Sequence, residues 1–163
     1  VQLREHKLDV ILSDCPLDST QHPDLLSKKL GECGVSFFCQ APLPEKAFPE
    51  CLMERKLLIP AKRTAMGRQL TRWFDEQGLA PQIFGEFDDA ALMKAFGLFN
   101  QGIFVAPTLY QEEFLDGQTV VLLGQTDALK EEYYAIFAER MIQHPAVKRL
   151  CESDFSALFA GLE

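Results

Sequence analysis

The segment EFDDAALMKAFGLFNQGIFVAPTLY, residues 86–110, constrains the fold of this chain more than any other part of the sequence. It begins as a strand and passes through two acidic residues into an amphipathic helix. After a glycine it returns to a second apolar strand, Ile103 to Ala106, of the kind that suits a strand covered on both faces. One stripe of the helix carries the apolar residues Leu92, Ala95, Phe96 and Phe99. The pattern predicts a βαβ unit.

In a βαβ unit, ligands tend to bind outside the carboxyl ends of the strands. Asp88, Asp89, Pro107 and Thr108 follow those ends, so we expect them to face one crevice. The plainest interpretation of the two aspartates is an N-cap and a favourable charge on the helix dipole. The alternative is a site for a hard cation such as sodium, which prefers carboxylate and carbonyl oxygens.

Strands and helices alternate through the middle of the chain, as expected for an α/β fold. Residues 57–60 read as a strand, 64–77 as a helix that ends at Gly78, and 82–87 as the next strand. Further strands are predicted at 27–32, 35–40, 119–123 and 132–138, and a short helix at 110–115. A closing helix starts at Pro145, is capped by His144 or Gln143, and has one apolar face: Val147, Leu150, Cys151, Phe155, Leu158 and Phe159.

The distribution of strands predicts two lobes. Residues 33–143 contain enough strands for a complete sheet, whereas the first segment contributes one clear apolar strand, at 8–13, and the last segment only a helix. We therefore expect residues 1–32 and 144–163 to form a first lobe, and residues 33–143 a second. An apolar parallel strand needs neighbours on both sides, so the first lobe is expected to be incomplete at its N-terminus.

Composition excludes several classes of protein. The chain is 47% hydrophobic and 25% charged, as in ordinary globular proteins, and its apolar runs are far shorter than the roughly 20 residues of a membrane helix. The polar opening, residues 1–7, does not resemble a signal peptide. A formal charge of −8 opposes binding to a phosphate backbone, so we do not expect these residues to contact DNA.

The cysteines and histidines do not predict catalysis. The five cysteines form no CxxC pair and have no histidine at metal-binding spacing, so we interpret them as buried or half-buried hydrophobes in a reducing cytoplasm. The three histidines form no Ser-His-Asp group and no metal group. The prediction is a protein that is not an enzyme and has no cofactor.

One further binding segment follows the strand at 57–60. Thr64, Ala65 and Met66 begin the helix, where unpaired backbone amides and a hydroxyl could hold an anion or a polar effector. Lys62, Arg63 and Arg68 would help to bind an anion, and their charge is the wrong one for a sodium site. Ordinary surface charge is the alternative interpretation.

In this arrangement the sequence resembles the effector-binding domain of LysR-type transcriptional regulators over essentially its whole length. The resemblance rests on four segments in order: QLREHKLDVILSD, VSFFCQAPLPEK, GIFVAPTL and HPAVKRLCESDFSALF. It implies a two-lobe domain of the periplasmic-binding-protein type II fold, hinged by two crossover strands, with the effector in the cleft. Ser13 and Asp14 end the first strand at a position that faces the effector in this family, although a polar turn is an equal alternative.

More narrowly, GECGVSFFC, GEFDDAALMKAFG, FVAPTLY and AIFAERMIQHPAV resemble a subgroup that activates the gene of a sodium/proton antiporter. This resemblance implies a response to sodium or lithium ions, or to a small polar effector. It also implies a homodimer or tetramer, promoter DNA bound through a winged helix-turn-helix outside this chain, and RNA polymerase as a further partner. The alternative is a solute-binding protein for transport, which shares the fold.

Overall fold

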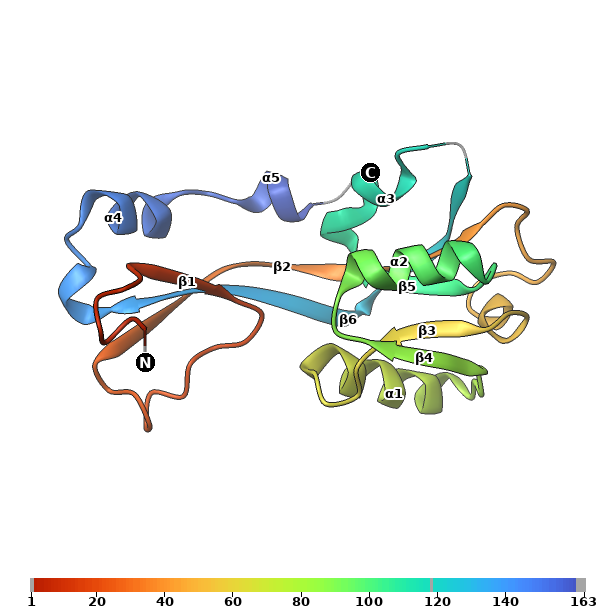
Figure 1. Ribbon diagram of the computed structural model, residues 1–163, viewed down its shortest axis with the longest axis horizontal. Coiled ribbons are helices and arrows are strands. Elements are labelled where there is room, and N and C mark those ends of the chain that lie inside the picture. The colour runs from red at the N-terminus through yellow and green to blue at the C-terminus, as the bar shows by residue number, and fades with distance from the viewer. Residues whose placement is uncertain (1, 118, 161–163) are drawn as a thin grey trace. The chain divides into compact units, whose positions relative to one another are not determined.

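The computed structural model describes residues 2–117 and 119–160, and these form two compact units. Unit 1 comprises the chain up to Glu32 together with Glu132–Ala160, and unit 2 comprises Cys33–Glu131. Two long strands belong to both units: β2 (Leu25–Gln40) and β6 (Val120–Ala138). The chain therefore crosses twice between the units, each time within a strand (Figure 1).

The second crossing differs from the sequence-based division of the chain. We expected residues 132–143 in the second lobe, but the structure places them in unit 1. The cause is that the two strands expected at 119–123 and 132–138 are one continuous strand, β6, whose last residues pair with β1. Likewise, the strands expected at 27–32 and 35–40 are the single strand β2. Val1 and residues 161–163 lie outside the described residues.

Unit 2 holds the predicted βαβ arrangement. In its part of the sheet the strands lie in the order β6-β2-β5-β3-β4; β3 is parallel to β4 and β5, and β2 is antiparallel to β5. Figure 1 shows α1 and α2 on opposite sides of β3 and β4. The elements between β2 and β6 are η1 (Glu50–Met53), β3 (Leu57–Pro60), α1 (Ala65–Gln77), β4 (Ile83–Phe87), α2 (Ala90–Phe99), β5 (Ile103–Pro107), η2 (Thr108–Tyr110) and α3 (Gln111–Leu115).

Helix α1 ends at Gly78, as its sequence predicts, whereas Thr64 is the N-cap rather than the first helical residue. The Thr64 hydroxyl accepts the backbone N–H of Gly67 at 3.0 Å, and Gly78 ends the helix in the left-handed conformation with φ of 66°. The buried side chains of α1 include Leu70, Trp73 and Phe74. The aromatic core of the unit continues from Trp73, which stacks on Phe37 and Phe48.

Helix α2 buries a different face from the one that its apolar stripe predicts. Leu92, Phe96 and Phe99 are exposed, Phe99 to 87%, whereas Met93 and Gly97 are buried. The reason is the close approach of α2 to β5, since a Cβ atom at Gly97 would overlap the ring of Phe104. The prediction for β5 is confirmed, because Ile103 to Ala106 are buried.

Unit 1 is smaller and has its own hydrophobic cluster. Strand β1 (Val10–Ser13) pairs antiparallel with the end of β6, and Leu3, Leu25, Ile136 and Ala138 form the buried cluster. The element η3 (Glu139–Met141) follows β6. The predicted closing helix is two helices, α4 (Pro145–Glu152) and α5 (Ser156–Phe159). His144 is the N-cap of α4, with Nδ1 accepting the N–H of Ala146 at 3.3 Å.

The helices of the described chain are too short or too polar to cross a membrane.

Candidate functional site

The candidate site in unit 2 is the carboxyl edge, which we define as the residues that follow β3, β4 and β5: Ala61–Thr64, Asp88–Asp89 and Pro107–Thr108. Because the three strands are parallel neighbours, their carboxyl ends lie along one edge of the sheet. A backbone hydrogen bond links the first segment to the end of β4, from the Ala61 N–H to the Phe87 carbonyl at 2.9 Å. Apart from Met66, which lies within α1, the site residues predicted in unit 2 therefore come from one edge, as the βαβ pattern indicates.

The acidic turn on this edge already has partners. The carboxylate of Asp89 accepts the N–H of Leu92 at 2.8 Å and so caps α2, which is the plain interpretation of this residue. Asp88 forms an exposed ion pair with Arg63 at 2.6 Å, and Lys62 donates its backbone N–H to Glu86 at 3.0 Å. The cationic segment after β3 thus neutralises the acidic end of β4.

These contacts also explain how carboxylates and cations can share one edge. Glu86, Asp88 and Asp89 bring three negative charges, and Lys62, Arg63 and Arg68 bring three positive charges. The described residues contain no group of three or more histidine, cysteine, aspartate or glutamate side chains arranged to hold a metal ion. The edge is thus an exposed surface on which carboxylates and cationic side chains form ion pairs.

Thr64 and Met66 have local roles at the start of α1. The Thr64 hydroxyl caps the helix and donates to the Ala61 carbonyl at 2.7 Å. Met66 is only 6% exposed and belongs to the hydrophobic core, so its side chain packs inward. Of these two residues, Thr64 is the one that keeps a polar, half-buried position on the edge.

Thr108 belongs to a buried polar group that sequence reasoning missed. Its hydroxyl lies 3.1 Å from the Ser36 hydroxyl, and Ser36 donates to Oε1 of Gln111 at 3.0 Å. Ser36 is fully buried and Gln111 is 5% exposed. A serine inside the apolar run VSFFC was the available signal, because a hydroxyl buried in a strand needs a partner. Of the three residues, Thr108 alone is half-buried rather than buried, at the end of β5.

In unit 1, Ser13 ends β1 and its hydroxyl accepts the N–H of Cys15 at 3.2 Å, which makes the polar turn that was the alternative interpretation. Asp14 is exposed. Across the sheet Ser13 pairs with Tyr134, which belongs to a second group that sequence reasoning missed. No local signal marks that group, because it joins two short segments that are far apart in sequence, one on β2 and one on β6.

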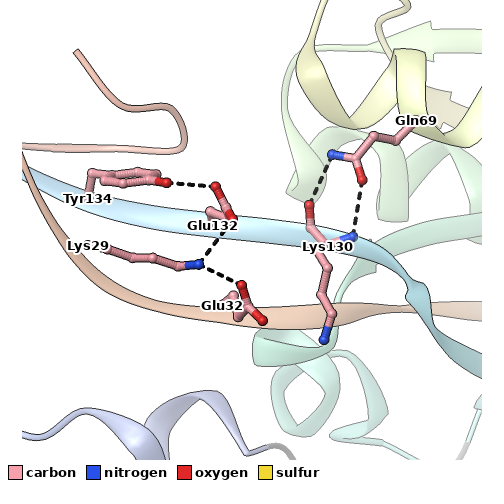
Figure 2. Close-up of polar contacts among 6 residues, drawn as sticks. All are labelled: Lys29, Glu32, Gln69, Lys130, Glu132 and Tyr134. Carbon is pink, nitrogen blue, oxygen red and sulfur yellow. Dashed lines mark hydrogen bonds and ion pairs between the residues drawn. The ribbon is translucent and has the colours of Figure 1, made fainter. Parts of the chain in front are cut away.

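Figure 2 shows this second group, in which Lys29 lies between two carboxylates. The Lys29 ammonium donates to Glu32 at 2.6 Å and to Glu132 at 3.0 Å, and the Tyr134 hydroxyl donates to Glu132 at 2.6 Å. The hydrogen bonds to Glu32 and then Glu132 raise the pKa of Lys29, whereas those from Tyr134 and then Lys29 lower the pKa of Glu132. Its bond to Glu132 raises the pKa of Tyr134.

In unit 2, Figure 2 also shows the Gln69 side chain of α1 paired with the backbone of Lys130 on β6. Gln69 donates to the Lys130 carbonyl at 3.0 Å and accepts the Lys130 N–H at 3.2 Å. The side-chain amide therefore completes both backbone hydrogen bonds of one residue on the crossing strand. The Lys29–Glu132 group and the Gln69–Lys130 pair therefore both form hydrogen bonds to β2 or β6 close to the residues where the chain passes between units.

Four of the five cysteines fit their predicted role, and one does not: Cys33, Cys39 and Cys51 are buried and Cys151 is half-buried. Cys39 and Cys51 are buried in unit 2, and that burial raises the pKa of both thiols, as expected for inert hydrophobes. Cys15, in contrast, is exposed, because it follows the polar turn at the end of β1.

The sequence and the structure define the class of this chain together. The family described as LysR substrate binding domain matches residues 1–153, and the chain belongs to that family. Its fold is accordingly periplasmic-binding-protein-like, of type II, as the sequence resemblance implied.

Among individual proteins, the chain is similar to transcriptional activator protein NhaR of Escherichia coli strain K12. The two are 62% identical over 159 residues, which cover 98% of this chain and 53% of that protein. NhaR of Shigella flexneri matches with the same identity and coverage. The chain therefore spans about half the length of the curated relatives that it matches.

Solved structures show the same fold. CbnR, a LysR family transcriptional regulator, has a TM-score of 0.71 at 14% identity, with 93% of this chain and 53% of that chain covered. DarR of Vibrio fischeri, solved in complex with DNA, has a TM-score of 0.68 at 25% identity with the same coverage. The regulatory domain of MexT from Pseudomonas aeruginosa has a TM-score of 0.70 at 8% identity, with 91% and 74% covered.

Proposed function

We propose that this chain is the effector-sensing part of a LysR-type activator that responds to sodium or lithium ions and controls a sodium/proton antiporter gene. The observation that carries the proposal is the 62% identity to the activator NhaR over 98% of the chain. The proposal includes a homodimer or tetramer, promoter DNA bound through a segment outside this chain, RNA polymerase as a partner, and action in the cytoplasm.

The proposed mechanism is a shift between conformations, with no bond broken. An effector that binds one conformation more tightly raises the population of that conformation, and the change repositions the DNA-binding segments. Within unit 2 we place a small polar effector at the carboxyl edge, next to Thr64, Pro107 and Thr108. Support comes from the half-buried Thr108 at the end of β5, whose hydroxyl is positioned by the buried Ser36 and Gln111 side chains. The predictions for Ser13 and Asp14 concern unit 1 and stay predictions.

For direct ion binding we propose the turn at Asp88 and Asp89. The ion would replace Arg63 as the partner of Asp88, and this exchange costs little because an exposed ion pair contributes only about 0–1 kcal/mol. Asp89 can keep one carboxylate oxygen on the Leu92 N–H and offer the other to the ion.

The test is a calorimetric titration of the full-length protein with sodium chloride and with potassium chloride at constant ionic strength. We expect saturable heat with sodium that Asp88→Asn and Asp89→Asn each remove. Asp89→Asn keeps a side chain that can cap the helix, so a loss of ion binding in this variant reports on the lost charge rather than on helix stability. Equal responses to both salts would exclude direct sensing, and unchanged binding in both variants would exclude this turn as its site.

The alternative of a solute-binding protein for transport is not favoured. The curated relatives are transcriptional activators, and the similar solved structures include a LysR regulator in complex with DNA. These relatives are regulators of transcription rather than enzymes.

A further inference from the structure

Unit 2 contains a cavity of about 480 Å³ at the edge opposite the carboxyl edge. Its walls come from segments that end β2 or precede β3, β4 and β5: Gln40, Arg55 and Lys56, Gln82, and Asn100 and Gln101. The cavity therefore lies at the amino ends of the parallel strands, and we call it the amino-end cavity. Its volume is within the range of about 300–1,000 Å³ that is typical of small-molecule sites.

Arg55 is the half-buried cation of this cavity. Its guanidinium donates to the carbonyls of Gln40 at 3.0 Å and Pro42 at 2.6 Å, so the side chain is held in one place. These bonds use two of the five N–H groups that an arginine carries. Glu54 also lines the cavity, and its carboxylate accepts the backbone N–H groups of Glu45 and Lys46, at 2.9 Å and 2.8 Å, so both of its oxygens are bonded to the adjoining loop.

Gln101 provides a second, independent observation. It follows helix α2 with φ of 53°, in the left-handed region where glycine is usual. The helix ends in a Schellman motif, because Gly102 N–H bonds to Gly97 O at 2.9 Å and Gln101 N–H bonds to Leu98 O at 3.4 Å. The unfavourable backbone of Gln101 therefore places a long side-chain amide on the cavity wall where the fold itself would favour glycine.

The amino-end cavity carries cationic side chains although the chain as a whole is acidic. The whole chain carries a formal charge of −8, which disfavours anions in general. The amino-end cavity gathers Arg55, Lys56 and the amides of Gln40, Gln82 and Gln101. Lys56 is also positioned, with Nζ 5.0 Å from the centre of the Phe84 ring. Guanidinium and amide N–H groups are the donors that bind carboxylate and phosphate oxygens, and the planar guanidinium matches them with two parallel bonds.

We propose that the amino-end cavity binds a small molecule bearing a carboxylate or phosphate group, with the Arg55 guanidinium on the oxyanion and the Gln101 side-chain amide donating a further hydrogen bond. This site is separate from the carboxyl edge, so its occupancy does not depend on the proposed response to sodium.

The experiment is a titration of the chain followed by two-dimensional NMR of the side-chain amide and arginine Nε–H signals. Potassium succinate and potassium phosphate are the two probes, each at constant ionic strength set with potassium chloride. We expect saturable shifts of the Arg55 and Gln101 side-chain signals. Saturation by succinate, by phosphate or by both supports the proposal and identifies the oxyanion. Shifts that grow linearly with each probe, or that are absent, would overturn it.

The decisive variant is Gln101→Gly, because it removes the amide while giving the backbone its preferred residue. We expect the dissociation constant to rise about threefold to tenfold, in line with the loss of one neutral hydrogen bond. Its unfolding temperature should equal or exceed that of the original chain. Arg55→Lys should weaken binding at least as much, since a lysine cannot make the paired contact.

Arg72→Lys is the matched control, because Arg72 is an exposed residue of α1 outside the cavity. It should leave the dissociation constant unchanged. Equal weakening in the Arg72 and Arg55 variants would mean that the effect does not arise in the amino-end cavity, and would overturn the proposal. So would an unchanged dissociation constant in Gln101→Gly, or a fall in its unfolding temperature.

Discussion

At the scale of single residues, Glu132 joins two donors in the group beside the crossing point of β6. It accepts from both Tyr134 and Lys29, and these bonds lower its pKa while raising those of the two donors. A carboxylate with a lowered pKa contributes stability above its ordinary value of 4.5 and loses it as the pH falls. A lysine with a raised pKa contributes below 10.5 and loses it as the pH rises. The group is therefore fully formed between these values.

We predict that Glu132→Gln lowers the pKa of Tyr134 toward its ordinary value of 10.0. A glutamine can still accept the tyrosine proton in a hydrogen bond, but it lacks the negative charge that opposes ionisation. The measurement is a pH titration of tyrosinate absorbance, in which Tyr134→Phe identifies the component that belongs to this residue. An identical titration for the original chain and the Glu132→Gln variant would contradict the hydrogen bond.

At the scale of elements, the contact of α2 with β5 depends on Gly97. Replacing glycine by alanine inside a helix normally stabilises it by about 1 kcal/mol. Here the new Cβ would overlap the Phe104 ring, and such overpacking costs about 1–3 kcal/mol. We predict that Gly97→Ala lowers the free energy of unfolding, measured with a denaturant.

Ala95→Gly on the same helix is the control for this prediction, because Ala95 is exposed. It should cost about 1 kcal/mol through helix propensity alone. If Gly97→Ala were instead as stable as the original chain or more so, α2 would not approach β5 as closely as described.

Helices α1 and α2 show which features of an element the sequence predicts and which it does not. Caps and strand ends depend on neighbouring residues, so the end of α1 at Gly78 and an N-cap from the Asp88–Asp89 pair could be predicted from the sequence. The buried face of α2 could not, because the usual rule places large apolar residues inside. Here a glycine makes the closest contact and leaves Phe96 and Phe99 outside. A helix that buries a face made by a glycine shows no matching stripe of large apolar residues in its sequence.

At the scale of the whole molecule, the two-unit α/β architecture was predictable because most strands and helices have a recognisable pattern of apolar residues. The polar groups were not, because each joins residues that are distant in sequence. Ser36 and Gln111 are 75 positions apart, and Lys29 and Glu132 are 103 apart. The continuity of β2 and β6 was missed for a related reason. Polar residues at the crossing points break the apolar pattern, although the backbone stays extended.

The two units differ in the size of their hydrophobic cores, and β2 passes through both. Its residues from 33 to 39 are buried among the aromatic side chains of unit 2, whereas most of those from 26 to 32 are exposed or half-buried. Unit 1 has the small cluster of Leu3, Leu25, Ile136 and Ala138. Local opening costs less free energy where fewer apolar side chains are buried, so unit 1 should open more readily than unit 2.

We therefore predict a change in hydrogen exchange along the single strand β2. Amides of residues 33–40 should exchange far more slowly than those of residues 25–32, since the first group opens only with the core of unit 2. Exchange followed by mass spectrometry measures this with peptides that end near Glu32, and peptides from β5 supply the fully protected reference. Uniform protection along β2 would mean that the two units unfold as one cooperative structure. The difference in the size of their cores would then not give them different opening free energies.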